Sequence, residues 1–217
     1  MTDYTALRTT MVDTQVRPSD VTKFTVIEAM LSVPREAFVP RDKRDAAYVG
    51  EHVSMGAGRV ILDPRVLAKM LDVADVQKDE LVLDIGSGLG YSAAVIARMA
   101  EAVVAVEDDE DRVAEAQTTL SEQGVDNVVM HEGALVDGAA GHGPYDVIIL
   151  QGAVEFLPDA LTAQLKEGGR IVSLERDGAL GTVRIGYLLN GVLNWRFAFN
   201  ANAPVLPGFE KHSAFTL

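Results

Sequence analysis

Short apolar runs separated by longer amphipathic segments fill the middle of the chain. Runs this short and this rich in Val, Ile and Leu predict buried strands, and they occupy residues 81–83, 103–106, 127–130, 145–150 and 170–174. Segments with helical spacing lie between them, at residues 91–99, 110–123 and 157–165. This alternation predicts an α/β fold with a doubly wound, mostly parallel sheet. A ligand would bind at the carboxyl ends of its strands.

The N-terminal third has helical character without strands between the helices. Residues 3–33 have one-face helical spacing, which a Pro-Ser pair interrupts, and Ser19 or Asp20 is the expected N-cap of the second helix. A further helix is predicted over residues 64–73, with Asp63 as its N-cap and a proline at its first position. We therefore expect N-terminal helices to pack beside the sheet.

The C-terminal part leaves the alternating pattern. Two strand-like runs, residues 182–189 and 192–199, meet at Asn190-Gly191, and this dipeptide is a strong hairpin signal. An apolar, proline-rich tail follows at residues 203–209. We expect an antiparallel hairpin at the edge of the sheet, with the tail packed against the domain.

Composition narrows the class of protein. The chain has 217 residues, of which 48% are hydrophobic. We expect one domain over residues 1–217, with helices and a loop in 1–75 and the sheet core in 76–217. A net charge of −13 disfavours a nucleic-acid partner, and no apolar run approaches the roughly 20 residues that span a membrane. Without cysteine or a signal-peptide pattern, we expect a cytoplasmic protein with no metal.

The stretch from residue 81 to residue 107 carries the clearest chemistry. A glycine turn, Gly86-x-Gly88-x-Gly90, follows one predicted strand and precedes a helix. Glycines let the backbone approach a ligand closely, and the helix offers free N–H groups to ligand oxygens. Glu107 ends the next strand, where a carboxylate accepts hydrogen bonds from a ribose diol. Asp84, before the turn, suits an amino group or a cation better than a pyrophosphate.

The spacing of the glycines separates two classes of nucleotide. A dinucleotide fingerprint reads G-x-G-x-x-G, but here the third glycine comes one residue early. Together with Asp84, this disfavours an NAD-dependent oxidoreductase. The pattern resembles the first motif of S-adenosylmethionine-dependent methyltransferases, whose ligand carries an ammonium and a sulfonium where NAD carries phosphates.

More of the chain resembles one family of these enzymes. The segments VIEAMLSVPREAFVP (residues 26–40) and DIGSGLGYSAAVIA (residues 84–97) are similar to protein-L-isoaspartate O-methyltransferases. The resemblance implies S-adenosylmethionine as cofactor and methyl transfer to a carboxylate of damaged aspartyl residues, a protein-repair reaction. It implies a cofactor site formed by Asp84, Gly86, Ser87, Gly88, Gly90, Glu107, Asp108, Glu132, Gly133, Ala134 and Gln151. In this set Glu132 takes the place of a family aspartate near the adenine.

The loop before the glycine turn departs from the family pattern. Where the family has G-x-G-Q-T-I-S-x-P, residues 56–64 read GAGRVILDP, with Arg59 for glutamine and Leu62 for serine. We expect Arg59, Ile61 and Leu62 to line the acceptor site. Arg59 either binds an acceptor carboxylate or lies solvated at the surface. Because leucine donates no hydrogen bond, activity on isoaspartyl peptides is expected to be weak or altered.

Three functions therefore stay open at this point. The first is methyl transfer to an isoaspartyl protein or peptide. The second is transfer by the same fold to another acceptor, such as a small carboxylate. The third is a non-catalytic homologue that binds the cofactor alone. A carboxylate acceptor is already ionised at neutral pH, so the reaction needs alignment and exclusion of water rather than a general base.

Overall fold

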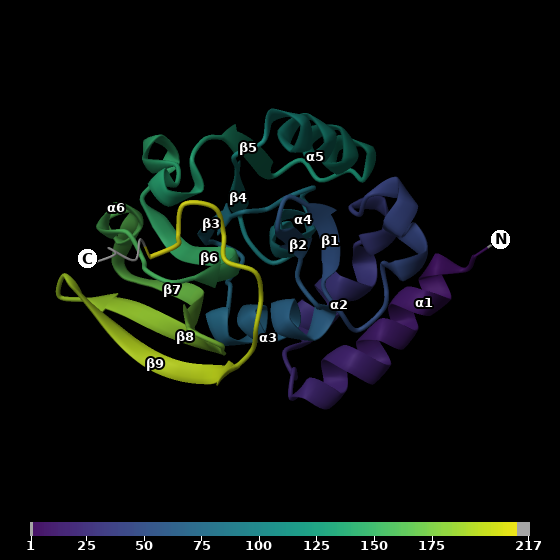
Figure 1. Ribbon diagram of the computed structural model, residues 1–217, viewed down its shortest axis with the longest axis horizontal. Coiled ribbons are helices and arrows are strands. Elements are labelled where there is room, and N and C mark those ends of the chain that lie inside the picture. The colour runs from purple at the N-terminus through teal and green to yellow at the C-terminus, as the bar shows by residue number, and fades with distance from the viewer. Residues whose placement is uncertain (1, 212–217) are drawn as a thin grey trace, which may run out of the picture.

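A seven-stranded sheet forms the centre of the molecule (Figure 1). This computed structural model describes residues 2–211, so the first residue and the last six of the expected domain lie outside it. The strands, in spatial order, are β5 (Val128–Glu132), β4 (Ala102–Glu107), β3 (Leu81–Ile85), β6 (Tyr145–Val154), β7 (Leu165–Asp177), β8 (Leu180–Leu189) and β9 (Val192–Asn200). Strands β5 to β7 are parallel, and β8 and β9 are antiparallel. The predicted fold class is confirmed.

The alternation of side chains along the strands divides the core into two layers. Along β6, Val147 and Ile149 belong to one buried cluster, and Ile148 and Leu150 belong to the other. This period of two is what a strand buried on both faces requires. The sheet therefore needs cover on each side.

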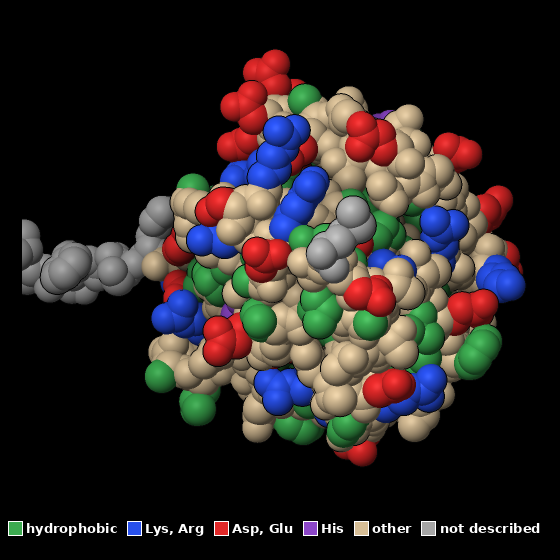
Figure 2. All heavy atoms as spheres, turned by 90° about the vertical axis from the view of Figure 1, so that its right-hand side faces the viewer, with side chains coloured by type: hydrophobic (Ala, Val, Ile, Leu, Met, Phe, Trp, Pro, Cys, Tyr) green, Lys and Arg blue, Asp and Glu red, His purple; other side chains and the backbone are tan. Residues whose placement is uncertain are grey.

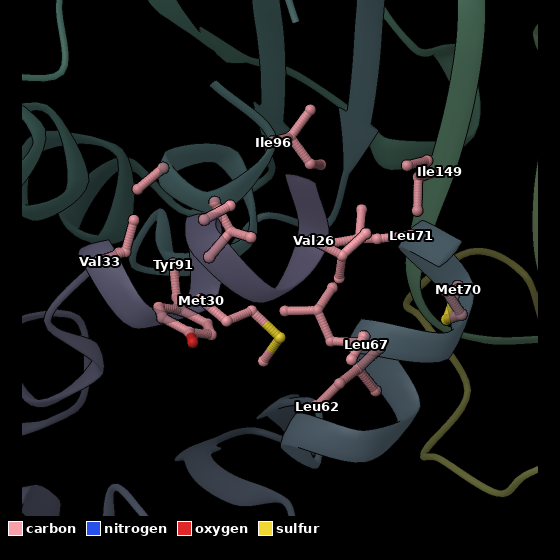
Figure 3. Packing of buried hydrophobic residues seen from close by; sticks show 14 of the residues in the cluster. Val26, Met30, Val33, Leu62, Leu67, Met70, Leu71, Tyr91, Ile96 and Ile149 are labelled. Atoms are coloured by element: carbon pink, nitrogen blue, oxygen red, sulfur yellow. The ribbon is translucent and has the colours of Figure 1, made fainter. Parts of the chain in front are cut away.

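Helices supply most of the cover on the first face. They are α1 (Tyr4–Met11), α2 (Phe24–Ser32), α3 (Pro64–Ala74), α4 (Tyr91–Ala97) and α5 (Glu110–Glu122). Figure 3 shows Val26 and Met30 of α2 close to Leu67 and Leu71 of α3, with Ile149 of the sheet beside them. Short 3-10 segments connect the larger elements, at Arg35–Ala37, Arg41–Ala46, Leu135–Asp137 and Ala140–His142.

The second face is covered by the C-terminal tail together with a short helix and residues 135–142, which corrects one prediction. The helix predicted over residues 157–165 is only α6 (Asp159–Thr162), because β7 already begins at Leu165. The tail takes its place: Ala153 donates to Pro204 O at 2.9 Å, and Leu206 donates to Ala153 O at 2.8 Å. Leu206 is buried against this face. The tail thus packs as predicted, and it reaches the carboxyl end of β6.

The second N-terminal helix begins later than predicted. A π-helical and a 3-10 segment follow α1, at Val12–Val16 and Arg17–Ser19. Asp20 then adopts a left-handed conformation with φ of 63°, which ends the helical run. As a result α2 begins at Phe24, and neither Ser19 nor Asp20 is its N-cap.

A small hairpin, in a segment predicted as a loop or a short extended piece, stands apart from the main sheet. It consists of β1 (Val53–Gly56) and β2 (Arg59–Ile61), which pair only with each other. Asp63 then caps α3 as predicted, accepting a hydrogen bond from the Arg65 N–H at 2.7 Å. The hairpin lies at the carboxyl ends of β3 and β4, because Met55 of β1 approaches Gly88 and Arg59 of β2 pairs with Glu107.

Charges of both signs cover the surface. Figure 2 shows the face on the right of Figure 1, where Lys and Arg side chains lie among Asp and Glu side chains. Within residues 2–211, no helix is long and apolar enough to cross a membrane.

The β8–β9 turn provides a test of the fold. Asn190 and Gly191 both have positive φ, at 53° and 73°, as a type I′ turn requires. We expect Gly191→Ala to lower the free energy of unfolding by about 1–2 kcal/mol, because an L side chain is strained in this conformation. Gly141→Ala is the control, since its φ is not positive and no atom lies within 4 Å of the added Cβ. Equal urea midpoints for the two variants would contradict this account of the turn.

Candidate functional site

The glycine turn lies where β3 ends and α4 begins. Gly86, Gly88 and Gly90 have φ of 78°, 59° and 92°, which non-glycine residues rarely adopt. The N–H groups of Gly86 and Ser87 donate to Val106 O, at 2.9 and 3.2 Å, and tie the turn to the end of β4. The turn therefore brings backbone amides to the carboxyl end of the sheet, as the sequence predicts.

Glu107 ends β4 directly beside this turn and is completely buried. Its carboxylate accepts from five donors: Oε2 from Gly88 N–H at 2.7 Å and Arg59 Nη2 at 2.8 Å, and Oε1 from Arg59 Nη1 at 2.9 Å, Arg112 Nε at 3.0 Å and Asp108 N–H at 3.2 Å. A carboxylate has about four lone-pair positions. The acid predicted to hold a ribose is thus saturated by groups of the protein.

Arg59 is the residue whose place differs most from the prediction. Only 2% of it is exposed, so it is not a solvated surface side chain. Its guanidinium forms a bidentate pair with Glu107 and reaches Asp108 at 2.9 Å. In this structure it therefore faces the nucleotide side of the site rather than an acceptor pocket.

Two apolar side chains fill the rest of the space above the turn. A Cβ on Gly88 would lie 2.6 Å from Met55 Cε, and a Cβ on Gly152 would lie 2.7 Å from Leu206 Cδ2. The cavity left beside the turn has a volume of only about 10 Å³, and Gly86 contributes to its wall. Little space remains at the position where the sequence predicts a ligand.

Asp84 lies beneath the turn, with no exposed surface. Its two oxygens accept hydrogen bonds from Ser92 Oγ and Gln151 Nε2, each at 2.6 Å. Burial raises the pKa of Asp84 to about 7, although the hydrogen bonds from Ser92 and Gln151 lower it. Asp84 thus positions Gln151 and the first turn of α4, instead of presenting a free carboxylate as the sequence predicts.

A separate hollow lies at the end of β5. Its volume is about 430 Å³, and it is lined by Asp108, Glu132, Gly133, Ala134, Leu135, Val136, Pro207 and Gly208. The Glu132 side chain is exposed there, as a residue that accepts from a base would have to be. The structure brings these predicted residues together at the end of β5, two strands away from β3, where the glycine turn begins.

The remaining residues of the predicted acceptor loop are buried. Leu62 is 2% exposed and packs with Leu67, as Figure 3 shows. Its carbonyl oxygen accepts from Nη2 of the buried Arg35 at 2.8 Å. Ile61 and Leu62 also line the small cavity beside Gly86. They therefore lie at the site, where their buried side chains form part of the wall of this cavity.

Sequence reasoning missed the residues that complete this site. Met55 and Leu206 approach it from the hairpin and from the tail, and Arg112 approaches Glu107 from α5. The short separation in sequence between Glu107, at the end of β4, and Arg112, on α5, was the signal for this pair. The other two carry no local signal, because their positions depend on tertiary packing.

Comparison with known proteins gives a consistent result. Residues 8–176 match the family model "Protein-L-isoaspartate(D-aspartate) O-methyltransferase (PCMT)". A protein-L-isoaspartate O-methyltransferase of Opitutus terrae is 38% identical over 162 residues, which are 75% of this chain and 70% of that relative. One from a Synechococcus strain is 35% identical over 88% of this chain and 81% of its own.

Solved structures share the fold. A putative protein-L-isoaspartate O-methyltransferase from Plasmodium falciparum, solved with S-adenosyl-L-homocysteine, has a TM-score of 0.79 at 18% identity and covers 95% of this chain and 99% of its own. Another protein-L-isoaspartate O-methyltransferase has the same TM-score at 23% identity, and the match covers 66% of that longer chain. At these identities the likeness concerns the fold.

The raised pKa of Asp84 predicts a specific dependence of stability on pH. Below about pH 4 the carboxyl is protonated in both states; as the pH rises to 7, only the unfolded state loses the proton. The native state therefore loses stability with rising pH, by about 2 kcal/mol between pH 5.5 and 8. Asp84→Asn removes this loss. Urea unfolding of both proteins at the two pH values measures the difference, and parallel pH profiles would contradict the assignment.

Proposed function

Because the chain belongs to the protein-L-isoaspartate(D-aspartate) O-methyltransferase family, we propose that it transfers a methyl group from S-adenosylmethionine to the carboxylate of isoaspartyl residues in proteins or peptides. The observation that carries the proposal is the contact of the Gly88 amide with Glu107 at the carboxyl end of the sheet. It lies within the segment that the family model matches. The proposal also treats residues 1–217 as one domain, since α1 to α4 share a hydrophobic cluster with the sheet.

The chemistry of the donor set supports this cofactor. Glu107 suits two ribose hydroxyls, and the exposed Glu132 suits an adenine amino group. The Ser87 hydroxyl oxygen is buried at the turn and has no hydrogen-bond partner among residues 2–211, which is the condition of a group that meets a ligand. The groups present therefore fit S-adenosylmethionine, provided that Arg59 leaves Glu107.

The chain's own part in the reaction would be to bind, to align and to exclude water. When bound, the cofactor supplies a methyl group on a sulfonium, which is electrophilic. Asp84 fixes the Gln151 amide and the start of α4, so the methionine end meets rigid groups. The β1–β2 hairpin would cover the acceptor, which is already ionised and needs only alignment. Arg35 holds the base of that loop through Leu62 O.

The acceptor is the open part of the proposal. Leucine at position 62 gives no side-chain donor, and Arg59 faces Glu107. Two alternatives stay open: a different carboxylate acceptor, and cofactor binding without turnover. The following experiment separates them. The cytoplasmic location expected from the sequence stays a prediction.

A paired-peptide assay tests the activity. The full chain is incubated with tritiated-methyl S-adenosylmethionine and either an isoaspartyl peptide or the same peptide with normal aspartate. We expect base-labile methyl ester on the isoaspartyl peptide alone. Equal labelling of both peptides would point to another carboxylate acceptor, and labelling of neither, with a known family enzyme active in the same assay, would contradict the proposal.

A pair of glycine variants tests the placement of the cofactor. Gly88 and Gly178 share a φ of 59°, so the backbone strain of alanine is the same at both positions, and the added Cβ at Gly88 also meets the flexible end of Met55. Only Gly88 lies at the proposed site; Gly178 lies in the β7–β8 turn with nothing within 4 Å of the added Cβ. We expect Gly88→Ala to lower kcat/KM at least about tenfold, because a Cβ blocks the close approach of the ligand. Gly178→Ala keeps the activity, and similar losses in both variants would contradict the placement.

A further inference from the structure

We propose that Arg59 competes with the cofactor for Glu107, so that the protein binds S-adenosylmethionine only by exchanging an internal ion pair for a ribose. This inference rests on the proposed function, because it concerns the regulation of the same site. The competitor is part of the chain, delivered by the β1–β2 hairpin. The hairpin is therefore a gate that closes the cofactor site.

The geometry makes the two occupants mutually exclusive. Arg59 uses both of its terminal nitrogens on the two Glu107 oxygens, at 2.9 and 2.8 Å. The backbone and Arg112 take the remaining positions. A ribose diol donates to the same two oxygens. With about four lone pairs on the carboxylate, it can bind only where the guanidinium has withdrawn.

Because the Arg59–Glu107 pair is buried, the competition lowers the affinity for the cofactor. Arg59 is 2% exposed and Glu107 is fully buried, so water does not screen the pair. An Arg–carboxylate pair with two parallel hydrogen bonds is also among the strongest in proteins. Only the molecules in which Arg59 has left Glu107 can bind the cofactor. The apparent affinity for the cofactor is therefore reduced by the fraction of molecules in that state.

A second side chain closes the methionine end of the site. Leu206 Cδ2 lies 3.0 Å from the position of a Cβ on Gly86 and 2.7 Å from that of a Cβ on Gly152. The guanidinium also approaches the turn, with Arg59 Nη2 3.2 Å from the same Gly86 position. The hairpin and the tail thus meet over one glycine.

A histidine links the hairpin and the tail. His52, just before β1, accepts from the Asp63 N–H through Nδ1 at 2.8 Å. With Nδ1 as acceptor, Nε2 carries the proton and donates to Asn202 O at 2.7 Å. His52 therefore connects the base of the hairpin to the residues that lead into the tail, which favours their moving together.

The hairpin is built to move. Val53 and Ile61 pack on the core at its base, but within residues 2–211 its two strands pair only with each other. No strand pairing with the main sheet therefore has to break when the hairpin moves. Its turn contains Gly56, Ala57 and Gly58, all with positive φ. These residues are exposed, and no atom lies within 4 Å of a Cβ added to either glycine. The turn can therefore change its conformation without disturbing the core.

Calorimetric titration of the full chain with S-adenosylhomocysteine tests the competition without an acceptor. We expect Arg59→Gln to bind at least about tenfold more tightly than the wild type, because glutamine cannot form the ion pair. Arg65→Gln is the matched control: its side chain is 58% exposed and lies 3.6 Å from Asp63, and its affinity stays unchanged. If Arg59→Gln fails to fold, Arg59→Lys is used, since lysine neutralises Glu107 but loses the bidentate geometry; it binds several-fold more tightly.

The outcomes separate this inference from the proposed function. Tighter binding by the Arg59 variants supports the gate, even if no protein in the series methylates the isoaspartyl peptide. Affinity equal to or weaker than that of the wild type in a folded Arg59 variant overturns the gate, even if the wild type methylates the peptide. Leu206→Ala tests the contribution of the tail separately, and we expect this variant to bind S-adenosylhomocysteine more tightly as well.

Discussion

The ion pair between Arg59 and Glu107 sets the shape of the nucleotide site. The sheet places the Glu107 carboxylate at its carboxyl end, with no exposed surface. A buried carboxylate requires donors, and those in reach are the Gly88 and Asp108 amides, Arg112 and Arg59. The arginine draws the β1–β2 hairpin over the site, so the position of a short surface element follows from one buried charge.

The features that the sequence predicts well are local. The strand, glycine turn, helix and acid between residues 81 and 107 depend on neighbouring residues, and all form as predicted. The same holds for the Asn190-Gly191 turn, because positive φ at both positions is a property of the dipeptide itself. The cap of α3 by Asp63 is local as well, because the side chain accepts from a backbone N–H two residues later. The family resemblance read from residues 26–40 and 84–97 is also confirmed, because the family model matches residues 8–176.

The features that the sequence predicts poorly depend on distant partners. Arg59 pairs with a residue 48 positions away, and its local pattern gives no sign of that partner. The helix predicted before β7 is only the short α6, because β7 pairs with β6 from Leu165 onward, and Leu206 of the tail packs on the same face of the sheet. Asp84 meets Ser92 of α4 and Gln151 of β6 instead of an open pocket, and Gln151 lies 67 positions away in the sequence. Each error arises where tertiary contacts override a local preference.

The departures from the family loop therefore bear on the cofactor as much as on the acceptor. A substitution that the sequence places at the acceptor, Arg59, lies on the ribose acid in the folded chain. A crystal structure of the full chain with S-adenosylhomocysteine tests this account most directly. We expect ribose hydroxyls within hydrogen-bond distance of Glu107, with the Arg59 guanidinium displaced from it. Ligand bound while Arg59 keeps both Glu107 oxygens would contradict it.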